Sequence, residues 1–191
     1  IPSYGYDTMV YGTQPLNEGK VEVYEKSGSS WSKIGQSIEG DVSGGGSNQV
    51  LGTFPYISGD GSRIVFNENY GNLFYSSQYH AQSVTVYEYS AGTWTRVGTP
   101  IEVQRTFASG NYSGQPVGCR FRAHGISTDG TRIVVVEQEE NDTALDPVIR
   151  VYEESGGSWS QLGPDITGST GFYRTSGNDE IYADISGDGT T

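Results

Sequence analysis

The chain has 191 residues, of which 23 are acidic and 11 basic, so its net charge is −12 at pH 7. Nucleic acids bind basic surfaces, so this balance argues against a nucleic-acid partner. No stretch approaches the ~20 consecutive apolar residues of a membrane span. The 14 tyrosines and 28 glycines favour many short strands and turns. We therefore expect an acidic, all-β protein without a membrane span.

The first residues form a weak copy of a motif that recurs later. Residues 1–12 stand where a repeat would begin, but they lack its Asp-Gly pair, and Pro2 weakens the strand pattern further. Terminal repeats are often degenerate in this way. The chain begins at Ile1 without a methionine or a signal-peptide pattern, so we take it to be a mature or fragmentary chain.

One sequence pattern occurs three times, at residues 21–35, 84–98 and 149–163. In each copy, alternating β-branched and polar residues end in Tyr, a Ser/Gly turn follows, and Trp and an aliphatic residue precede a final Gly. This pattern predicts a β-hairpin. The three Trp residues are 63 and 65 positions apart, and such a period is typical of repeat proteins.

A second element alternates with the hairpin. Ile-Ser-x-Asp-Gly-x-Arg-Ile-Val occupies residues 57–65 and 126–134, and residues 185–191 are an incomplete copy. Asp-Gly between apolar runs predicts a further tight turn. We expect Asp60, Asp129 and Asp188 to accept hydrogen bonds from the backbone of their own turns. A calcium site is the less favoured interpretation, because the Asp-x-Asp-x-Asp-Gly spacing is absent.

Together the two elements predict units of four antiparallel strands, which is the pattern of a β-propeller blade. We expect blades at residues 1–56, 57–124 and 125–183. Residues 184–191 would be the start of a further repeat or a strand donated to another copy. Ser-x-Asp-Gly-x-Arg-Ile, followed by Val-x-Val-Tyr-x-x-x-x-Gly-x-Trp-x-x-x-Gly, resembles the FG-GAP-like and TolB-like propeller repeats of secreted and surface proteins. The resemblance covers most of the chain, and these families are too varied to imply one function.

The recurrent aromatic residues are expected to pack between blades, because they recur at fixed strand positions. The alternative is a row of rings that stack on carbohydrate. These residues are Trp31, Trp94, Trp159, Tyr24, Tyr87 and Tyr152.

Binding residues would lie in the long loops on one rim, at 39–56, 67–82, 102–125 and 167–184. The alternative is that these loops pack on neighbouring blades or simply vary. Asn111 and Asn141 begin Asn-x-Ser/Thr sequons, which favour a secreted glycoprotein over chance occurrence only modestly. Cys119 is the single cysteine, so no disulfide forms within the chain, and we expect it to be a small buried apolar residue.

No catalytic set stands out. The two histidines, His80 and His124, lie in unrelated segments, which disfavours a zinc site or a Ser-His-Asp triad. Any two of the 23 acidic residues could form a glycosidase pair, but the most visible ones follow the repeat. One acidic cluster could hold a cation or simply be solvated. It comprises Glu137, Glu139, Glu140, Asp142 and Asp146.

Three blades are too few for a closed ring, so an open run would expose two apolar faces. We therefore expect a non-enzymatic, extracellular structural protein that assembles head to tail with other copies of itself. The alternative is a fragment of a surface propeller that binds a glycan or a protein through its rim loops. A glycosidase is the third and least favoured hypothesis, and no cofactor is expected.

Overall fold

The computed structural model describes residues 8–13, 20–39, 50–70, 81–102, 119–139, 147–167 and 181–191. These residues form an all-β fold of antiparallel sheets. Within the described ranges, no helix is long and apolar enough to cross a bilayer.

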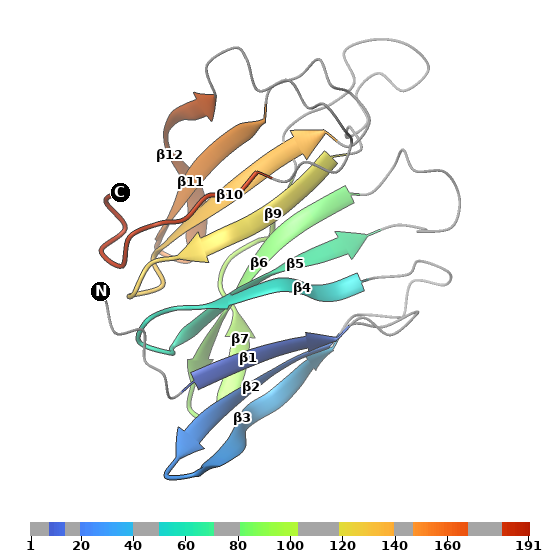
Figure 1. Ribbon diagram of the computed structural model, residues 1–191, viewed down its shortest axis with the longest axis vertical. Helices are drawn as coiled ribbons and strands as arrows, with labels where there is room; N and C mark the ends of the chain where they lie inside the picture. Colours follow the sequence, from blue (N-terminus) through green and yellow to red (C-terminus); the bar gives the residue numbers. More distant parts are fainter. Residues whose placement is uncertain are drawn as a thin grey trace.

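The strands form three sheets that follow one another along the chain (Figure 1), here named blade 1, blade 2 and blade 3. Their antiparallel order, with neighbours in sequence also neighbours in the sheet, is consistent with a propeller-like fold, although the described part of blade 1 has three strands and not the expected four. Blade 1 contains β1 (Thr8–Thr13), β2 (Lys20–Ser27) and β3 (Ser30–Glu39). Blade 2 contains β4 (Val50–Ile57), β5 (Arg63–Tyr70), β6 (Ala81–Ser90), β7 (Thr93–Arg96) and the short β8 (Ile101–Glu102), which pairs with β6. Blade 3 contains β9 (Cys119–Ile126), β10 (Arg132–Glu139), β11 (Val148–Ser155) and β12 (Ser158–Thr167).

The strand register repeats from blade to blade. Tyr87 lies opposite Ile64, and Tyr152 lies opposite Ile133, so these two pairs are equivalent. In blade 1 the partner of Tyr24 is Met9. Strand β1 therefore occupies the second strand position of a blade, equivalent to β5 and β10.

The blade boundaries differ from those expected from the sequence. Breaks at 56/57 and 124/125 would fall inside β4 and β9, which the structure assigns to blades 2 and 3. The reason is that β4 does not alternate cleanly. Its register with β5 shifts twice, and Phe54 within it has φ 52°. Such bulges break the two-residue period by which a strand is recognised.

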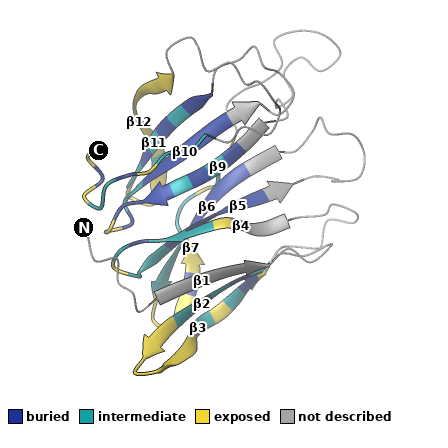
Figure 2. Ribbon diagram, in the orientation of Figure 1, coloured by how far each residue is buried: buried dark blue, intermediate teal, exposed yellow. Residues whose placement is uncertain are grey.

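Two hydrophobic clusters fill the spaces between blades. We call the side of a blade that points to the next blade its forward face, and the opposite side its rear face. The forward face of blade 1 contributes Val21, Val23, Ile34 and Ile38 to a cluster with Ile57, Ile64, Phe66, Tyr87, Tyr89 and Trp94 of blade 2. The forward face of blade 2 contributes Val65, Val84, Val86, Val97 and Ile101 to a cluster with Phe121, Ala123, Ile126, Ile133, Val135, Tyr152 and Trp159 of blade 3. Figure 2 shows much of the described length of β5, β6, β9 and β10 as buried, whereas β2 and β3 are mostly intermediate or exposed.

The Asp-Gly turns of neighbouring blades are joined through their backbones. The N–H of Asp60 donates to the Thr128 carbonyl at 3.0 Å, and the N–H of Thr128 donates to the Gly187 carbonyl at 2.7 Å. These bonds link the turns of blades 2 and 3 to the incomplete repeat at the end of the chain.

Residues 181–191 therefore pack on their own blade 3. Arg132 Nη1 donates to the Gly189 carbonyl at 3.0 Å, just as Arg63 Nη1 donates to the Gly130 carbonyl at 3.2 Å one blade earlier. This segment is not assigned as a strand, but it stands where the first strand of a further blade would begin.

Candidate functional site

The first joint, between blades 1 and 2, is made by Trp94. Its indole Nε1–H donates to the Ile34 carbonyl at 3.0 Å, and the side chain is only 2% exposed. The indole packs on Gly35, where a Cβ atom would lie 2.6 Å from Trp94 Cδ1. Gly35 also has φ 70°, in a region that glycine adopts readily. The shared Gly of the hairpin motif thus makes room for the Trp of the next blade.

The second joint, between blades 2 and 3, repeats this geometry. The Nε1–H of Trp159 donates to the Val97 carbonyl at 3.0 Å. Gly98 has φ 71°, and a Cβ atom there would lie 3.3 Å from Trp159 Cδ1 and 2.7 Å from the Gly157 carbonyl. Each joint therefore pairs a Trp with a main-chain carbonyl and a glycine of the preceding blade.

The end blades carry the two unmatched halves of this joint. Trp31 is 44% exposed, which differs from the expectation that all three Trp residues pack in the core. The physical reason is that no described blade lies behind Trp31 to cover it. On the forward face of blade 3, Leu162 is 42% exposed, Ile166 is 53% exposed, and nothing lies within 4 Å of a Cβ built on Gly163.

The two internal joints differ at the residue after the shared Gly. In the first joint, the side chain of Gln36 makes two hydrogen bonds to the main chain of Trp94. Its Oε1 accepts from the Trp94 N–H at 3.0 Å, and its Nε2 donates to the Trp94 carbonyl at 2.7 Å. The equivalent residue in the second joint is Thr99. Its short side chain has a hydroxyl and a methyl group on Cβ and carries no amide. Among the described side chains, none bonds to the main chain of Trp159 in this way.

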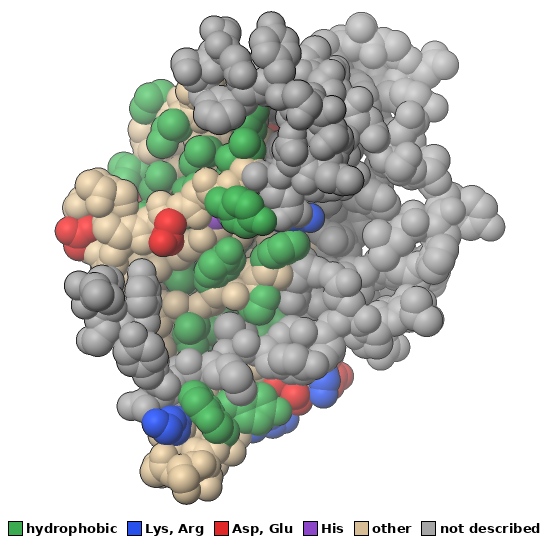
Figure 3. All heavy atoms as spheres, viewed as in Figure 1, with side chains coloured by type: hydrophobic (Ala, Val, Ile, Leu, Met, Phe, Trp, Pro, Cys, Tyr) green, Lys and Arg blue, Asp and Glu red, His purple; other side chains and the backbone are tan. Residues whose placement is uncertain are grey.

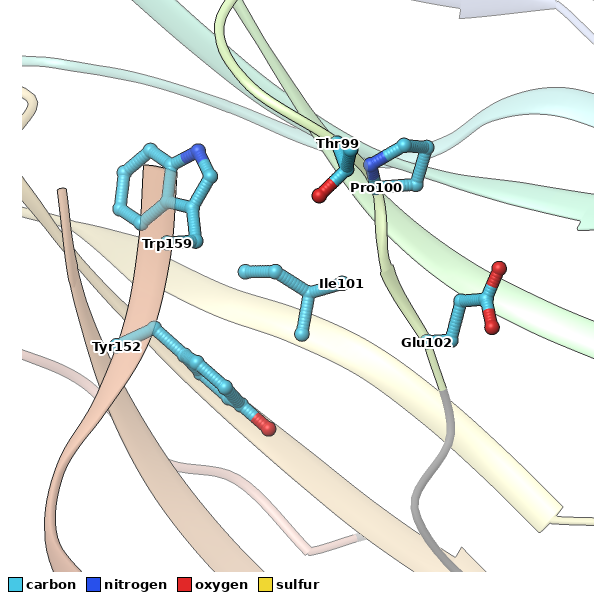
Figure 4. Close-up of a pocket in the computed structure, with 6 residues that line it drawn as sticks. All are labelled: Thr99, Pro100, Ile101, Glu102, Tyr152 and Trp159. Atoms are coloured by element: carbon cyan, nitrogen blue, oxygen red, sulfur yellow. The ribbon is translucent and has the colours of Figure 1, made fainter. Parts of the chain in front are cut away.

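An open pocket of about 500 Å³ lies at the second joint. In Figure 4, Trp159 and Tyr152 of blade 3 face Thr99 and Glu102 of blade 2, and the Ile101 side chain points between them. Pro100 lies beside Thr99 and completes the lining. The pocket combines aromatic and aliphatic surfaces with a hydroxyl and a carboxylate.

Tyr152, which lines this pocket, lies near a buried charged cluster. Arg150 bonds both oxygens of Asp165, at 2.8 and 3.0 Å, and also pairs with the fully buried Glu137. Burial disfavours the charge of Arg150, but the hydrogen bonds of Asp165 and Glu137 outweigh it and raise the Arg150 pKa. Burial raises the pKa of Tyr152, while the nearby charge of Arg150 opposes that rise. The Tyr152 hydroxyl stays neutral at ordinary pH.

The three recurrent aspartates lie in their turns. Asp129 accepts from Ser127 Oγ at 2.6 Å, from the Thr131 N–H at 3.0 Å and from Thr131 Oγ1 at 2.9 Å. Asp60 and Asp188 accept from the equivalent groups. Burial opposes the Asp129 charge, but these bonds lower its pKa from the usual value, and the pKa of the exposed Asp188 is about 2. Among the described residues, no three His, Cys, Asp or Glu side chains are grouped to hold a metal ion.

Other candidate residues are dispersed. The His124 ring lies edge-on to Tyr182, with centroids 6.0 Å apart. Tyr24 donates to Glu22 at 3.1 Å, whereas Tyr87 stacks on Phe66. Outside the described residues lie His80, Asn111, Asn141, Glu140, Asp142 and Asp146, together with the side chains of Cys119 and Glu139.

Sequence reasoning did not single out Gln36, Thr99 or Glu102. A signal was present, since the residue that follows the shared Gly changes between copies of an otherwise regular motif. It is Gln36 in the first copy, Thr99 in the second and Pro164 in the third.

Comparisons with known proteins assign no family to the chain. No protein-family model and no curated protein matches the sequence. The chain is similar to the structure of an alpha-L-arabinanase from Penicillium chrysogenum complexed with arabinobiose, with 10% sequence identity and a TM-score of 0.39. The match covers 81% of this chain and 44% of the arabinanase, so the chain spans less than half of that enzyme. The resemblance to FG-GAP-like and TolB-like repeats gains no support here and stays a prediction, as does the number of blades.

Proposed function

We propose that the protein is a non-enzymatic structural protein that assembles head to tail through its end blades. The forward face of blade 3 in one copy would contact the rear face of blade 1 in the next. The observation that carries this proposal is the pair of unmatched half-joints. Trp31 is exposed at one end, Gly163 is uncovered at the other, and the complete joint of Trp and Gly occurs twice inside the chain.

The forward face of blade 3 supports the proposal by its apolar character. A groove of about 390 Å³ lies there, between the blade and the segment 181–191. Figure 3 shows hydrophobic side chains gathered over this part of the molecule, around β11 and β12. The groove-lining residues of the blade are equivalent to those that blade 2 buries against blade 3. They are Val134, Ile149, Val151, Leu162 and Ile166.

The position of residues 181–191 refines the idea of a donated strand. The segment is held on its own blade 3, so it does not reach out freely to another copy. Blade 1, as described, starts at the second strand position, and β1 pairs only with β2 among the described strands. In the assembly, residues 181–191 of one copy would supply the first strand of a blade that β1, β2 and β3 of the next copy complete. Such a heterologous contact builds a filament when its rotation does not close.

Sedimentation of paired variants tests this proposal. Trp31→Ala disables the rear face and Leu162→Asp disables the forward face, so each variant alone should remain monomeric. An equimolar mixture retains one working joint and should give one-to-one dimers. Ser29→Ala, in the exposed turn beside Trp31, is the control and should assemble like the wild type. A wild type that stays monomeric at every concentration would contradict the proposal, and so would a larger intact mass showing that further blades belong to the same polypeptide.

The proposal includes an extracellular location with N-glycans at Asn111 and Asn141. Its support is the two sequons and the acidic, glycine-rich composition. Peptide mapping of native protein should find sugar on these residues. Two unmodified asparagines would remove this part of the proposal.

A second candidate function is ligand binding, as a segment of a glycan-binding propeller. The observation that favours it is the open pocket at the second joint, where the first joint is closed by Gln36. Binding at this pocket does not require assembly, so the two functions can be tested separately.

A further inference from the structure

We infer that the pocket between blades 2 and 3 binds an N-acetylated sugar through its acetamido group. The inference rests on the second candidate function and does not depend on assembly. It comes from comparing the two internal joints, which share their backbone geometry but differ at Gln36 and Thr99.

The first joint shows which chemical group can hydrogen-bond to the main chain of the Trp. Tyr89 and Trp94 face each other one position from the two-residue turn Ala91-Gly92. In such a hairpin this pair is not hydrogen-bonded, so the N–H and carbonyl of Trp94 point away from β6. Consistently, the N–H of Tyr89 donates to Ser62 on the other side of its strand. The outward groups of Trp94 are taken up by the carboxamide of Gln36.

The second joint has the same hairpin register without that carboxamide. Glu154 faces Trp159 one position from the turn Gly156-Gly157, and the Glu154 N–H donates to Thr131. The main-chain N–H and carbonyl of Trp159 therefore point away from β11, as those of Trp94 point away from β6, and the residue equivalent to Gln36 is Thr99. A threonine cannot present a carbonyl acceptor and an N–H donor at the distance that a glutamine reaches. The pocket thus offers a donor and an acceptor spaced for an amide.

An acetamido group restores both bonds. Its carbonyl accepts from the Trp159 N–H and its N–H donates to the Trp159 carbonyl, as the two ends of the Gln36 amide do for Trp94. Both are ordinary neutral hydrogen bonds, each of which adds about 0.5–1.5 kcal/mol net. The acetyl methyl group would lie toward Ile101, which is 6% exposed.

The remaining lining fits a sugar ring better than a peptide. The faces of Trp159 and Pro100 are apolar surfaces for the C–H groups of a pyranose, while Glu102 and Thr99 are polar groups for its hydroxyls. Ligand sites typically combine an apolar lining with a few placed polar groups in this manner, at volumes of about 300–1,000 Å³. Since the chain carries a net charge of −12, a neutral N-acetylhexosamine is favoured over an acidic sugar.

Titration of the chain with matched sugars tests the inference. N-acetylglucosamine and N-acetylgalactosamine are compared with glucose, galactose and glucosamine by ligand-observed NMR and calorimetry. The acetylated sugars should bind at least about tenfold more tightly than the others, as two added hydrogen bonds predict. Free glutamine is included because its side chain ends in the same amide.

Two reciprocal variants assign the site. Thr99→Gln should close the pocket as Gln36 closes the first joint, so sugar binding is lost while the melting temperature stays equal or rises. Gln36→Thr should open a second pocket and raise the stoichiometry from one to two. Thr95→Gln, the same change at an exposed position of β7 outside the pocket lining, is the matched control and should bind like the wild type.

The outcomes separate the inference from the binding function. Equal affinity for glucose and N-acetylglucosamine, lost in Thr99→Gln, would overturn the acetamido inference and leave a sugar-binding pocket. Glutamine binding more tightly than any sugar would overturn the choice of a sugar. Unchanged binding in Thr99→Gln would place the site elsewhere, and no binding of any probe would overturn both the inference and the binding function.

Discussion

Trp94 and Gly35 touch so closely that no other residue fits at the glycine without movement, since a Cβ atom there would lie 2.6 Å from Trp94 Cδ1 and 2.9 Å from Trp94 Nε1. The contact lies between two blades and is 59 residues apart in sequence. Gly163 has nearly the same backbone, with φ 76° against 70°, but nothing within 4 Å. A side chain at Gly163 would therefore meet only backbone strain, whereas a side chain at Gly35 would meet the same strain and also a clash with Trp94.

Replacing Gly35 by Ala should destabilise the fold more than the same change at Gly163. Both variants suffer the cost of a Cβ at positive φ, about 1 kcal/mol. Gly35→Ala adds the clash with Trp94, at about 1–3 kcal/mol for overpacking. Urea unfolding at low protein concentration measures the difference. Equal losses in the two variants would contradict the packing of Trp94 on Gly35.

Truncation of the three Trp residues should give unequal losses. Trp94→Ala should cost about 3–5 kcal/mol, because a large buried side chain is removed. The cost should be smaller for the partly exposed Trp159 and smallest for Trp31, which is covered least. Thermal unfolding of dilute protein checks this order. A loss at Trp31 as large as that at Trp94 would mean that another blade already covers Trp31.

Loss of Arg150 should be costly because it leaves Glu137 buried without its cationic partner. We expect Arg150→Met to cost about 3–5 kcal/mol, as for other broken buried pairs. The control is Lys20→Met, which removes an exposed partner of Glu22 and should cost less than about 1 kcal/mol. Adding Glu137→Leu to Arg150→Met should recover much of the loss. No recovery in this double variant would show that the charge of Glu137 is not the cause.

Stability should fall in acid as the turn aspartates are protonated. Hydrogen bonds lower the folded-state pKa of Asp188 to about 2, and for Asp60 and Asp129 they outweigh the opposing effect of burial and lower the pKa from its usual value. A lowered folded pKa stabilises the fold above the unfolded pKa, and this contribution is lost as pH falls through the folded pKa. The free energy of unfolding should therefore decrease from about pH 5 to about pH 2.

Asparagine at all three turn positions tests the origin of this acid sensitivity. The triple variant Asp60→Asn, Asp129→Asn, Asp188→Asn should be less stable at neutral pH and show a shallower decline in acid. Urea midpoints measured across the pH range give both quantities. A decline as steep as in the wild type would assign the effect to other carboxylates, such as Glu22, whose pKa is also about 2.

The sequence repeat made the hairpins and their register predictable. The solvent exposure of the recurrent Trp side chains was not predictable, because it depends on what lies next to each blade. The pattern around Trp94 and Trp159 indicates equivalent strands, and the equivalent registers of Tyr87 and Tyr152 agree with it. Trp31 has the same local sequence but a different environment, because burial depends on a neighbouring sheet that no local pattern encodes. The start of β4 was missed since bulges interrupt its alternation.

The pocket at the second joint could not be predicted from any one sequence motif. It arises from the difference between Gln36 and Thr99, two polar residues that look alike in a pattern search. Only the structure shows that Gln36 hydrogen-bonds to the Trp94 main chain, and that Thr99 is too short to do the same at Trp159.

The acceptors of the two joints are main-chain carbonyls, at Ile34 and Val97, and each bonded Trp rests on a glycine without a side chain of its own. One part of the contact between neighbouring blades is therefore made by atoms that every repeat possesses, beside the side chains of the two hydrophobic clusters. For that part of the contact, the gain, loss or exchange of a whole repeat needs no compensating change in the adjoining one. The residue that follows the glycine can then change from one repeat to the next, and it is already different in the three copies, as Gln36, Thr99 and Pro164.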